Sequence, residues 1–271
     1  MRMKRRAAVA AFACAAVGIA AGVHAQTPQV AGKLAILSLI GDAITINEYV
    51  GQTGTNVDSL KRQTVPIPDA VFDRAALLSA QDALKKLNPG AQIATLAPPK
   101  AGSDSDPAKL IVDGRVDATN PLVAALRKEG YGQLVVVSKL RAPAQMRLRS
   151  ESVGHGHVTG LGFYVDKYFE IKKVATGETV RGFIAPYAYL KLSLVDLESL
   201  AVVRVKDIPQ DRIEGDFRGK SGISPWDALT AEEKTRILRE LIMKSVADAI
   251  PGLVDATTKQ QAPATPALQP G

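Results

Sequence analysis

The segment Ser152–Gly160, SVGHGHVTG, contains the residues with the clearest capacity for metal chemistry. On a β-strand, the i, i+2 spacing of His155 and His157 places both imidazoles on one face, where they could chelate a zinc or copper ion. A closed site needs a third and a fourth ligand, and the neighbouring sequence offers none. We therefore interpret the segment as a glycine-rich loop or bulge that enters a strand, and we predict no metal and no cofactor.

The stretch Leu34–Ile46, LAILSLIGDAITI, is similar to the first strand of serine esterases, in which Gly-Asp precedes the nucleophilic serine. In this chain Ala43 stands at that position and has no oxygen with which to attack. A serine hydrolase also needs a general base, usually histidine, and no histidine lies near the C-terminus. We predict a bent edge strand here and no catalytic residue.

Two other patterns could mark a binding site. Gly219-Lys220-Ser221 matches the end of a phosphate-binding loop, but that motif requires glycine where this chain has Glu214, so we interpret the segment as an ordinary loop. Tyr164 and Tyr168 alternate with apolar residues, together with Asp166 and Glu170. Such a polar strand face is either a partner surface or is covered by a helix or loop of the same chain.

Residues 1–25 have the pattern of a secretory signal peptide. Basic residues precede an apolar run from Ala7 to Ala21, and VHA precedes Gln26, so we expect cleavage between Ala25 and Gln26. A membrane anchor is the alternative, but the run is shorter than the roughly 20 residues that span a bilayer. A lipoprotein signal at Cys14 is a further alternative, which Phe12 disfavours because a small residue is expected there.

Removal of this leader changes the composition. The four basic residues Arg2, Lys4, Arg5 and Arg6 leave with it, which lowers the formal net charge from +7 to +3. This small excess gives no support for nucleic-acid binding. The single cysteine, Cys14, also leaves, so the exported chain has no disulfide, thiolate nucleophile or cysteine ligand.

Hydrophobic periodicity then predicts the elements. Strands are expected at 33–41, 43–49, 92–96, 133–140 and 163–171, and a pair joined by a turn near Asp196–Ser199. One helix is expected to start at Pro68 with Asp69 as its cap and to bury a face that includes Leu87; a second runs from Asn120 to Gly130. The last helix begins with a Thr230–Glu233 capping box and ends at Pro251. Residues 255–271 form an Ala/Pro/Gln-rich tail that we expect to be disordered.

These elements predict one α/β domain over residues 26–254, with a mixed, largely antiparallel sheet and packed helices. Their order resembles the periplasmic domains of curli-secretion and penicillin-binding-protein-activator lipoproteins and, more loosely, the N-terminal domain of TolB. The segments that carry the resemblance are Lys33–Asp42, Tyr131–Leu140 and Tyr189–Val203. The chain departs from these relatives at Ser199-Leu200, where they usually have Thr-Gly, and in its expected unlipidated start at Gln26. The resemblance implies an architecture and an envelope compartment.

The sequence therefore favours a soluble periplasmic or secreted accessory protein that binds an envelope protein without catalysis, and with no stable membrane span once the leader is removed. A hydrolase that uses Asp/Glu pairs is an alternative, because such carboxylates meet only in the fold. A small-ligand-binding protein is another, although the sequence shows no boundary between two lobes. The partner and the oligomeric state cannot be predicted.

A chelating histidine pair has a measurable consequence. If His155 and His157 bind one ion, zinc or copper should raise the melting temperature of the chain and should leave that of the His155→Ala/His157→Ala variant unchanged. If the metal changed the melting temperatures of the two proteins equally, the histidine pair would not be a metal site.

Overall fold

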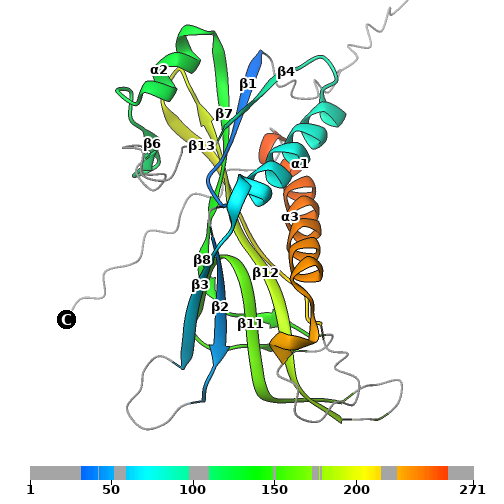
Figure 1. The fold of residues 1–271 in the computed structure, drawn as a ribbon. Helices are drawn as coiled ribbons and strands as arrows, with labels where there is room; N and C mark the ends of the chain where they lie inside the picture. Colours follow the sequence, from blue (N-terminus) through cyan, green and yellow to red (C-terminus); the bar gives the residue numbers. More distant parts are fainter. Residues whose placement is uncertain are drawn as a thin grey trace, which may run out of the picture.

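The computed structural model describes residues 32–41, 43–51, 59–97, 110–148, 151–172, 177, 179–214 and 225–255. These residues form an 11-stranded sheet, a two-stranded sheet and α-helices (Figure 1), which confirms the predicted α/β class with a mixed sheet. The strands are β1 (Lys33–Ser38), β2 (Ala43–Tyr49), β3 (Leu60–Pro66), β4 (Gln92–Leu96), β5 (Ile111–Val112), β6 (Arg115–Val116), β7 (Tyr131–Lys139), β8 (Arg141–Pro143), β9 (Met146–Arg147), β10 (Ser152–Val153), β11 (His157–Lys172), β12 (Thr179–Asp196) and β13 (Ala201–Asp211). The helices are α1 (Val71–Leu87), α2 (Pro121–Lys128) and α3 (Ala231–Val254), with 3₁₀ turns η1 (Pro68–Ala70) and η3 (Pro225–Ala228).

The 18-residue strand β12 runs through the whole molecule and joins its two halves (Figure 1). Along one edge, its first part pairs antiparallel with β11 and its last part, Leu190–Asp196, pairs antiparallel with β7. The upper half continues from β7 to β1 and β4, which are parallel to one another. The lower half continues from β11 to β2 and β3. Both β1 and β2 thus have a neighbour on each side, so the predicted edge strand is wrong.

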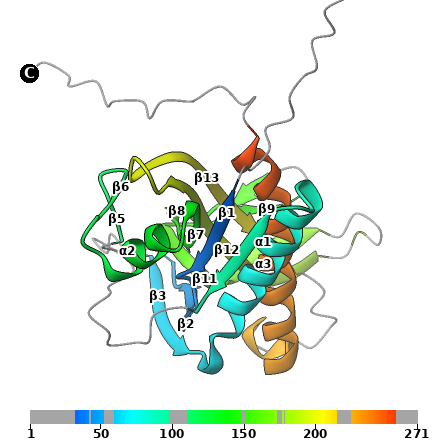
Figure 2. The same cartoon turned by 90° about the horizontal axis from the view of Figure 1, so that it is seen from above.

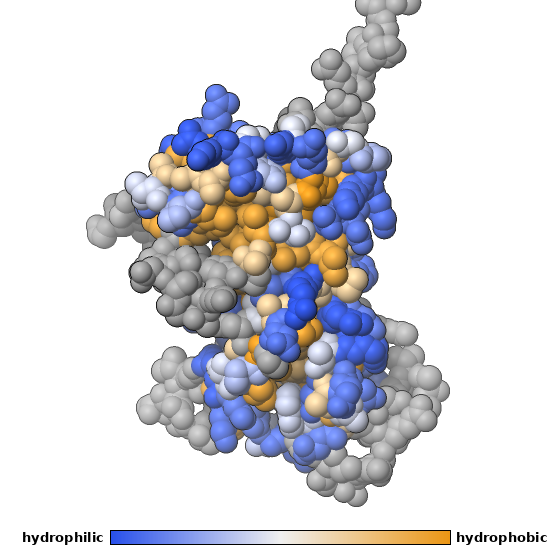
Figure 3. Space-filling model, turned by 45° about the horizontal axis from the view of Figure 1, so that its top comes forward, coloured by the Kyte–Doolittle hydropathy of each residue, from blue (hydrophilic) through white to orange (hydrophobic). Residues whose placement is uncertain are grey.

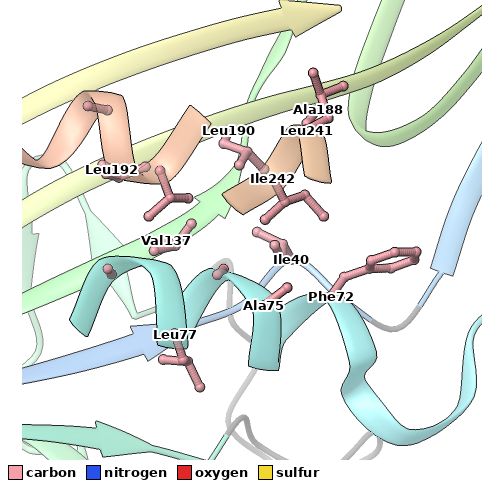
Figure 4. Close-up of a cluster of buried hydrophobic side chains, with 14 of the residues drawn as sticks. Ile40, Phe72, Ala75, Leu77, Val137, Ala188, Leu190, Leu192, Leu241 and Ile242 are labelled. Atoms are coloured by element: carbon pink, nitrogen blue, oxygen red, sulfur yellow. The ribbon is translucent and has the colours of Figure 1, made fainter. Parts of the chain in front are cut away.

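One face of the sheet is covered by α1 and α3, which pack side by side (Figure 2). The core between them is apolar and includes Ile40, Phe72, Val137, Leu190 and Ile242 (Figure 4). Phe72, Leu190 and Ile242 have no solvent-accessible surface. Full burial of one such side chain contributes roughly 1.5–3 kcal/mol, so this layer supplies much of the stability of the fold.

The opposite face has two separate covers. In the upper half, α2 and the β5–β6 hairpin enclose a cluster that includes Leu37, Leu126 and Val195. In the lower half, the chain from β8 to the start of β11 folds back over a cluster rich in aromatic side chains. Its members are Leu60, Leu140, Ala144, Met146, Val158, Tyr164, Phe183, Ala185, Tyr187 and Tyr189. The inner parts of β11 and β12 are therefore buried on both faces.

This second cover decides between the two interpretations of the polar face on the long strand, because a segment of the same chain covers its first half. Tyr164 is fully buried and Asp166 is 4 % exposed, whereas Tyr168 and Glu170 are exposed. A bulge between Asp166 and Glu170 changes the register against β12, and the strand leaves the core at this point. Alternation of residue types cannot show where a strand stops being covered.

The predicted helix signals are partly confirmed. The Asn120 side chain accepts a hydrogen bond from the amide of Leu122, and the Thr230–Glu233 capping box is formed. Asp69 is not the cap of α1, because it lies in a left-handed conformation within η1, one residue before the N-cap position. The helix α3 continues through Pro251 to Val254, and at its end Arg204 of β13 binds the carbonyl groups of Leu253 and Asp255. The segment 219–221, interpreted as an ordinary loop, the leader and the tail from residue 256 lie outside the described residues.

Contact between β2, β11 and β12 leaves no room for a side chain at Gly162. A Cβ atom there would overlap the carbonyl oxygen of Thr45 and lie 2.6 Å from the hydroxyl oxygen of Tyr187. We expect Gly162→Ala to lower the free energy of unfolding by about 3 kcal/mol in urea denaturation, because both contacts involve buried, well-packed groups. Gly132→Ala is the matched control, since a Cβ atom at that strand position would meet nothing within 4 Å. Equal stability of the two variants would contradict this packing.

Candidate functional site

Three aromatic side chains that are far apart in the sequence meet at the lower end of the molecule. The rings of Tyr49 and His155 are stacked with 4.3 Å between their centroids and 15° between their planes. The ring of Tyr168 meets that of Tyr49 edge to face, at 6.2 Å and 84°. Tyr168 is 52 % exposed and His155 is exposed. We refer to Tyr49, His155 and Tyr168 as the aromatic cluster.

The position of His155 is fixed by its backbone. Its amide nitrogen donates a hydrogen bond to the hydroxyl of the buried Tyr164, at 3.1 Å. The residues on either side, Gly154 and Gly156, both have a positive φ, which other residues rarely adopt. A Cβ atom on Gly156 would also press against the side chain of Leu60. This local geometry holds the imidazole against Tyr49.

Burial raises the pKa of Tyr164 well above that of an ordinary phenol. The hydroxyl therefore stays protonated, and it can accept from His155 while it keeps its own proton. Tyr164 acts as a positioning residue for the cluster, not as part of the exposed surface.

The bulge in β11 places Tyr168. One carboxylate oxygen of Asp166 accepts hydrogen bonds from the amides of Tyr168 and Phe169, at 2.8 and 3.0 Å. The bulge leaves these amides outside the regular ladder, and the carboxylate binds them instead. Tyr168 is thereby turned outward toward Tyr49, and Phe169 packs edge to face on Phe183.

Tyr49 is held at the end of β2 by the lower sheet. Its strand neighbour Glu48 forms an ion pair with Lys167 at 2.5 Å, and this hydrogen bond raises the pKa of the lysine. The preceding residue of the strand is Asn47. Its side-chain amide donates a hydrogen bond to the hydroxyl of Tyr187 at 2.7 Å, and both groups are buried. The end of β2 is thus fixed on both sides of the sheet.

The structure does not bring the two histidines together as a strand pair. His155 lies in the loop before β11, stacked on Tyr49, while His157 is the first residue of β11 and pairs with Pro143. Within the described ranges, no group of three or more His, Cys, Asp or Glu side chains is placed to hold a metal ion. The alternative i, i+2 strand geometry is not formed, because the left-handed Gly156 separates the two residues, and the segment is a glycine-rich loop that enters the strand, as predicted.

The buried carboxylates of the described chain accept hydrogen bonds from backbone amides. Asp73 accepts from the amide of Ile40 at 3.0 Å, Asp166 holds the bulge, and Asp211 accepts from the amide and the guanidinium of Arg147 at 2.7 and 3.2 Å. Each lies on a different element and replaces a missing backbone partner. Their arrangement explains loop geometry and offers no evident acid/base pair.

Sequence reasoning considered His155 and Tyr168 in separate segments and did not connect either with Tyr49. The available signal was the glycine on each side of His155, which indicates a fixed loop, and the polar Asp166 in an otherwise apolar strand, which can mark a bulge. Their meeting depends on the fold-back of residues 141–160, which no local pattern encodes.

No protein-family model matches the sequence, and comparison with curated proteins finds no relative. Among solved structures, a DUF330-family protein from Xanthomonas campestris is similar with a TM-score of 0.39 at 9% identity, covering 85% of this chain and 88% of the other. A neuraminyllactose-binding hemagglutinin homolog from Helicobacter pylori gives 0.40 at 11%, covering 83% and 86%. The PelC dodecamer from Paraburkholderia phytofirmans gives 0.30 at 11%, covering 83% and 90%.

At these identities and TM-scores, the likeness assigns neither a family nor an activity to the chain. None of the three is described as a curli-secretion, penicillin-binding-protein-activator or TolB-like protein. The resemblance drawn from the strand segments therefore stays a prediction.

The role of Asp166 can be measured directly. Asp166→Val removes the acceptor of two backbone amides, so we expect a loss of about 2 kcal/mol in the free energy of unfolding and faster hydrogen exchange at Tyr168 and Phe169. Asp166→Asn keeps one carbonyl oxygen and should retain most of the protection. If Asp166→Val exchanged at these two amides as slowly as the unmodified chain, the carboxylate would not be holding the bulge.

Proposed function

We propose that the chain is an exported accessory protein of the cell envelope that binds a partner protein through the aromatic cluster and has no catalytic activity. The observation that carries the proposal is the arrangement of Tyr49, His155 and Tyr168, whose rings are held together by the backbone while Tyr168 and His155 remain exposed. Aromatic residues, tyrosine above all, are enriched among the residues that dominate binding energy in protein interfaces.

The fixed backbone makes the cluster suitable for binding. Ordering a flexible side chain in an interface costs roughly 0.5–1.5 kcal/mol. Tyr164 and Asp166 order the loop and the bulge before any partner arrives, so much of this cost is absent. A tyrosine also offers a large apolar face and a hydroxyl that can remain hydrated or bind a polar group.

The export leader at residues 1–25 supports an envelope location. In the part of the chain that the structure describes, no helix is long and apolar enough to cross a membrane. The leader predicts a periplasmic or secreted protein that starts at Gln26.

The structure favours this proposal over the two alternatives. A carboxylate hydrolase needs acidic groups aimed at a substrate, whereas the buried Asp73, Asp166 and Asp211 bind backbone amides of the same chain. A two-lobed ligand-binding protein needs a hinge between separate sheets, whereas β12 is continuous through both halves.

Site-specific photo-crosslinking tests the proposal. A benzoylphenylalanine at position 168 should give a discrete crosslinked species in cells that export the chain, and the Tyr49→Ser/His155→Ser variant should reduce its yield at least severalfold. Val205 is the control position, since it is 53 % exposed on β13, away from the cluster. The proposal fails if positions 168 and 205 give the same species, or if loss of the two neighbouring rings leaves the yield unchanged while the chain stays folded by circular dichroism.

A further inference from the structure

The upper end of the molecule, opposite the aromatic cluster, collects basic side chains. The parallel strands β4, β1 and β7 all begin at this end, and Lys33 is paired with Gln92 and Tyr131. Helices α1 and α2 end immediately before β4 and β7, with Lys85, Lys86, Arg127 and Lys128 in their last turns. Topology therefore places Lys33, Lys85, Lys86, Arg127 and Lys128, all exposed, at one end (Figure 1). We refer to these five residues as the basic end.

The five cations of the basic end lie together without a carboxylate partner among the described residues. Six other cations of the described chain do pair with carboxylates, namely Arg147 with Asp211, Lys167 with Glu48, Lys191 with Asp207, Arg212 with Glu214, Arg236 with Glu240 and Lys244 with Asp248, whereas Lys61 and Lys206, on other strands, also form no such pair within the described ranges. At the basic end, none of the five cations forms an ion pair with a carboxylate of the described residues. Lys33 donates to the backbone carbonyl of Glu129 and lies 5.9 Å from the centre of the Tyr131 ring. Basic residues in a last helical turn also complement the helix dipole, but that role does not apply to Lys33.

The basic end also has an exposed apolar side chain. Leu87, the last residue of α1, follows Lys85 and Lys86 directly and is 48 % exposed, although its place in the helical pattern predicts burial. Hydrophilic residues line the upper rim of the molecule in Figure 3, with a broad apolar area below them. At an anionic lipid surface, a leucine beside lysines can lie at the boundary of the headgroup region while the lysines remain among the headgroups.

The chain itself brings this end to a membrane. Lys33 is only seven residues after the expected cleavage at Ala25–Gln26, and seven extended residues reach about 25 Å. During export the basic end is therefore the part of the domain tethered closest to the lipid surface. Nucleic acid, the other common partner of unpaired cations, is not expected in the compartment to which the leader directs the chain.

We propose that the basic end binds reversibly to the surface of membranes that contain anionic lipids, with the five cations near the headgroups and Leu87 at the boundary. This binding is independent of the partner proposed for the aromatic cluster. It is electrostatic in origin, so salt weakens it.

Vesicle co-sedimentation tests the inference. The chain from Gln26 to Gly271 is mixed at low salt with vesicles of phosphatidylcholine alone or with 30% phosphatidylglycerol. We expect roughly tenfold or stronger binding to the anionic vesicles, lost at 0.5 M salt. The Lys85→Gln/Lys86→Gln/Arg127→Gln/Lys128→Gln variant should lose at least tenfold in affinity.

The matched control removes the same number of charges from other exposed positions: Lys61→Gln, Lys206→Gln, Arg236→Gln and Lys244→Gln. It should bind within about twofold of the unmodified chain, because these residues lie away from the basic end. Equal loss in both variants would show that only net charge matters and would overturn the site. Absence of vesicle binding by the unmodified chain, or retention on heparin without binding to vesicles, would also overturn it.

Discussion

The structure depends on one strand whose two faces must both be covered. From Gly182 to Leu190, every residue of β12 is buried, and alternate side chains enter different cores. Ile184, Ala188 and Leu190 pack under α1 and α3, whereas Phe183, Tyr187 and Tyr189 pack under the segment from β8 to the start of β11. A strand of this kind is unstable alone, because each uncovered face would expose a row of apolar side chains. The helices and the fold-back are the two covers that it requires.

The face of the lower sheet that the fold-back covers contains tyrosines, and their buried hydroxyls need hydrogen-bond partners. The hydroxyls of Tyr164, Tyr187 and Tyr189 are held in the interior, and each has a partner: the amide of His155, the side chain of Asn47 and the amide of Gln145. Burial raises the pKa of all three phenols, so they remain neutral and can be satisfied by one or two hydrogen bonds. Two of the three partners belong to the covering segment. The same bonds that satisfy the core therefore fix the loop that carries His155.

Local sequence patterns predicted the strands β1, β2, β4, β7, β11, β12 and β13, the turn between β12 and β13, the Asn120 cap and the Thr230–Glu233 capping box, because each depends on residues close in the sequence. Local patterns did not predict the structure where contacts with a segment distant in the sequence determine it. The alternation in β11 left open whether its polar face is covered, and the fold-back of residues 141–148 and 151–160 buries Tyr164. Pro251 was predicted to end α3, but the helix continues to Val254, and Arg204 of β13 binds the carbonyl groups at its end. Asp69 was predicted as a cap, but the left-handed turn before α1 removes it from that position. The aromatic cluster was missed for the same reason, since its members meet only after the fold-back.

The length of β12 has a mechanical consequence. Phe183 pairs with Asp166, which pairs with Tyr49, whereas Asp196 lies beside Gln133 near the start of β7. These two levels are thirteen residues apart along one unbroken strand, about 40 Å at 3.3 Å per residue. Hydrogen-bonded neighbours along this length make the strand stiff. The aromatic cluster and the basic end are thus held at a fixed distance from each other, and two binding events at these surfaces could occur only at that separation.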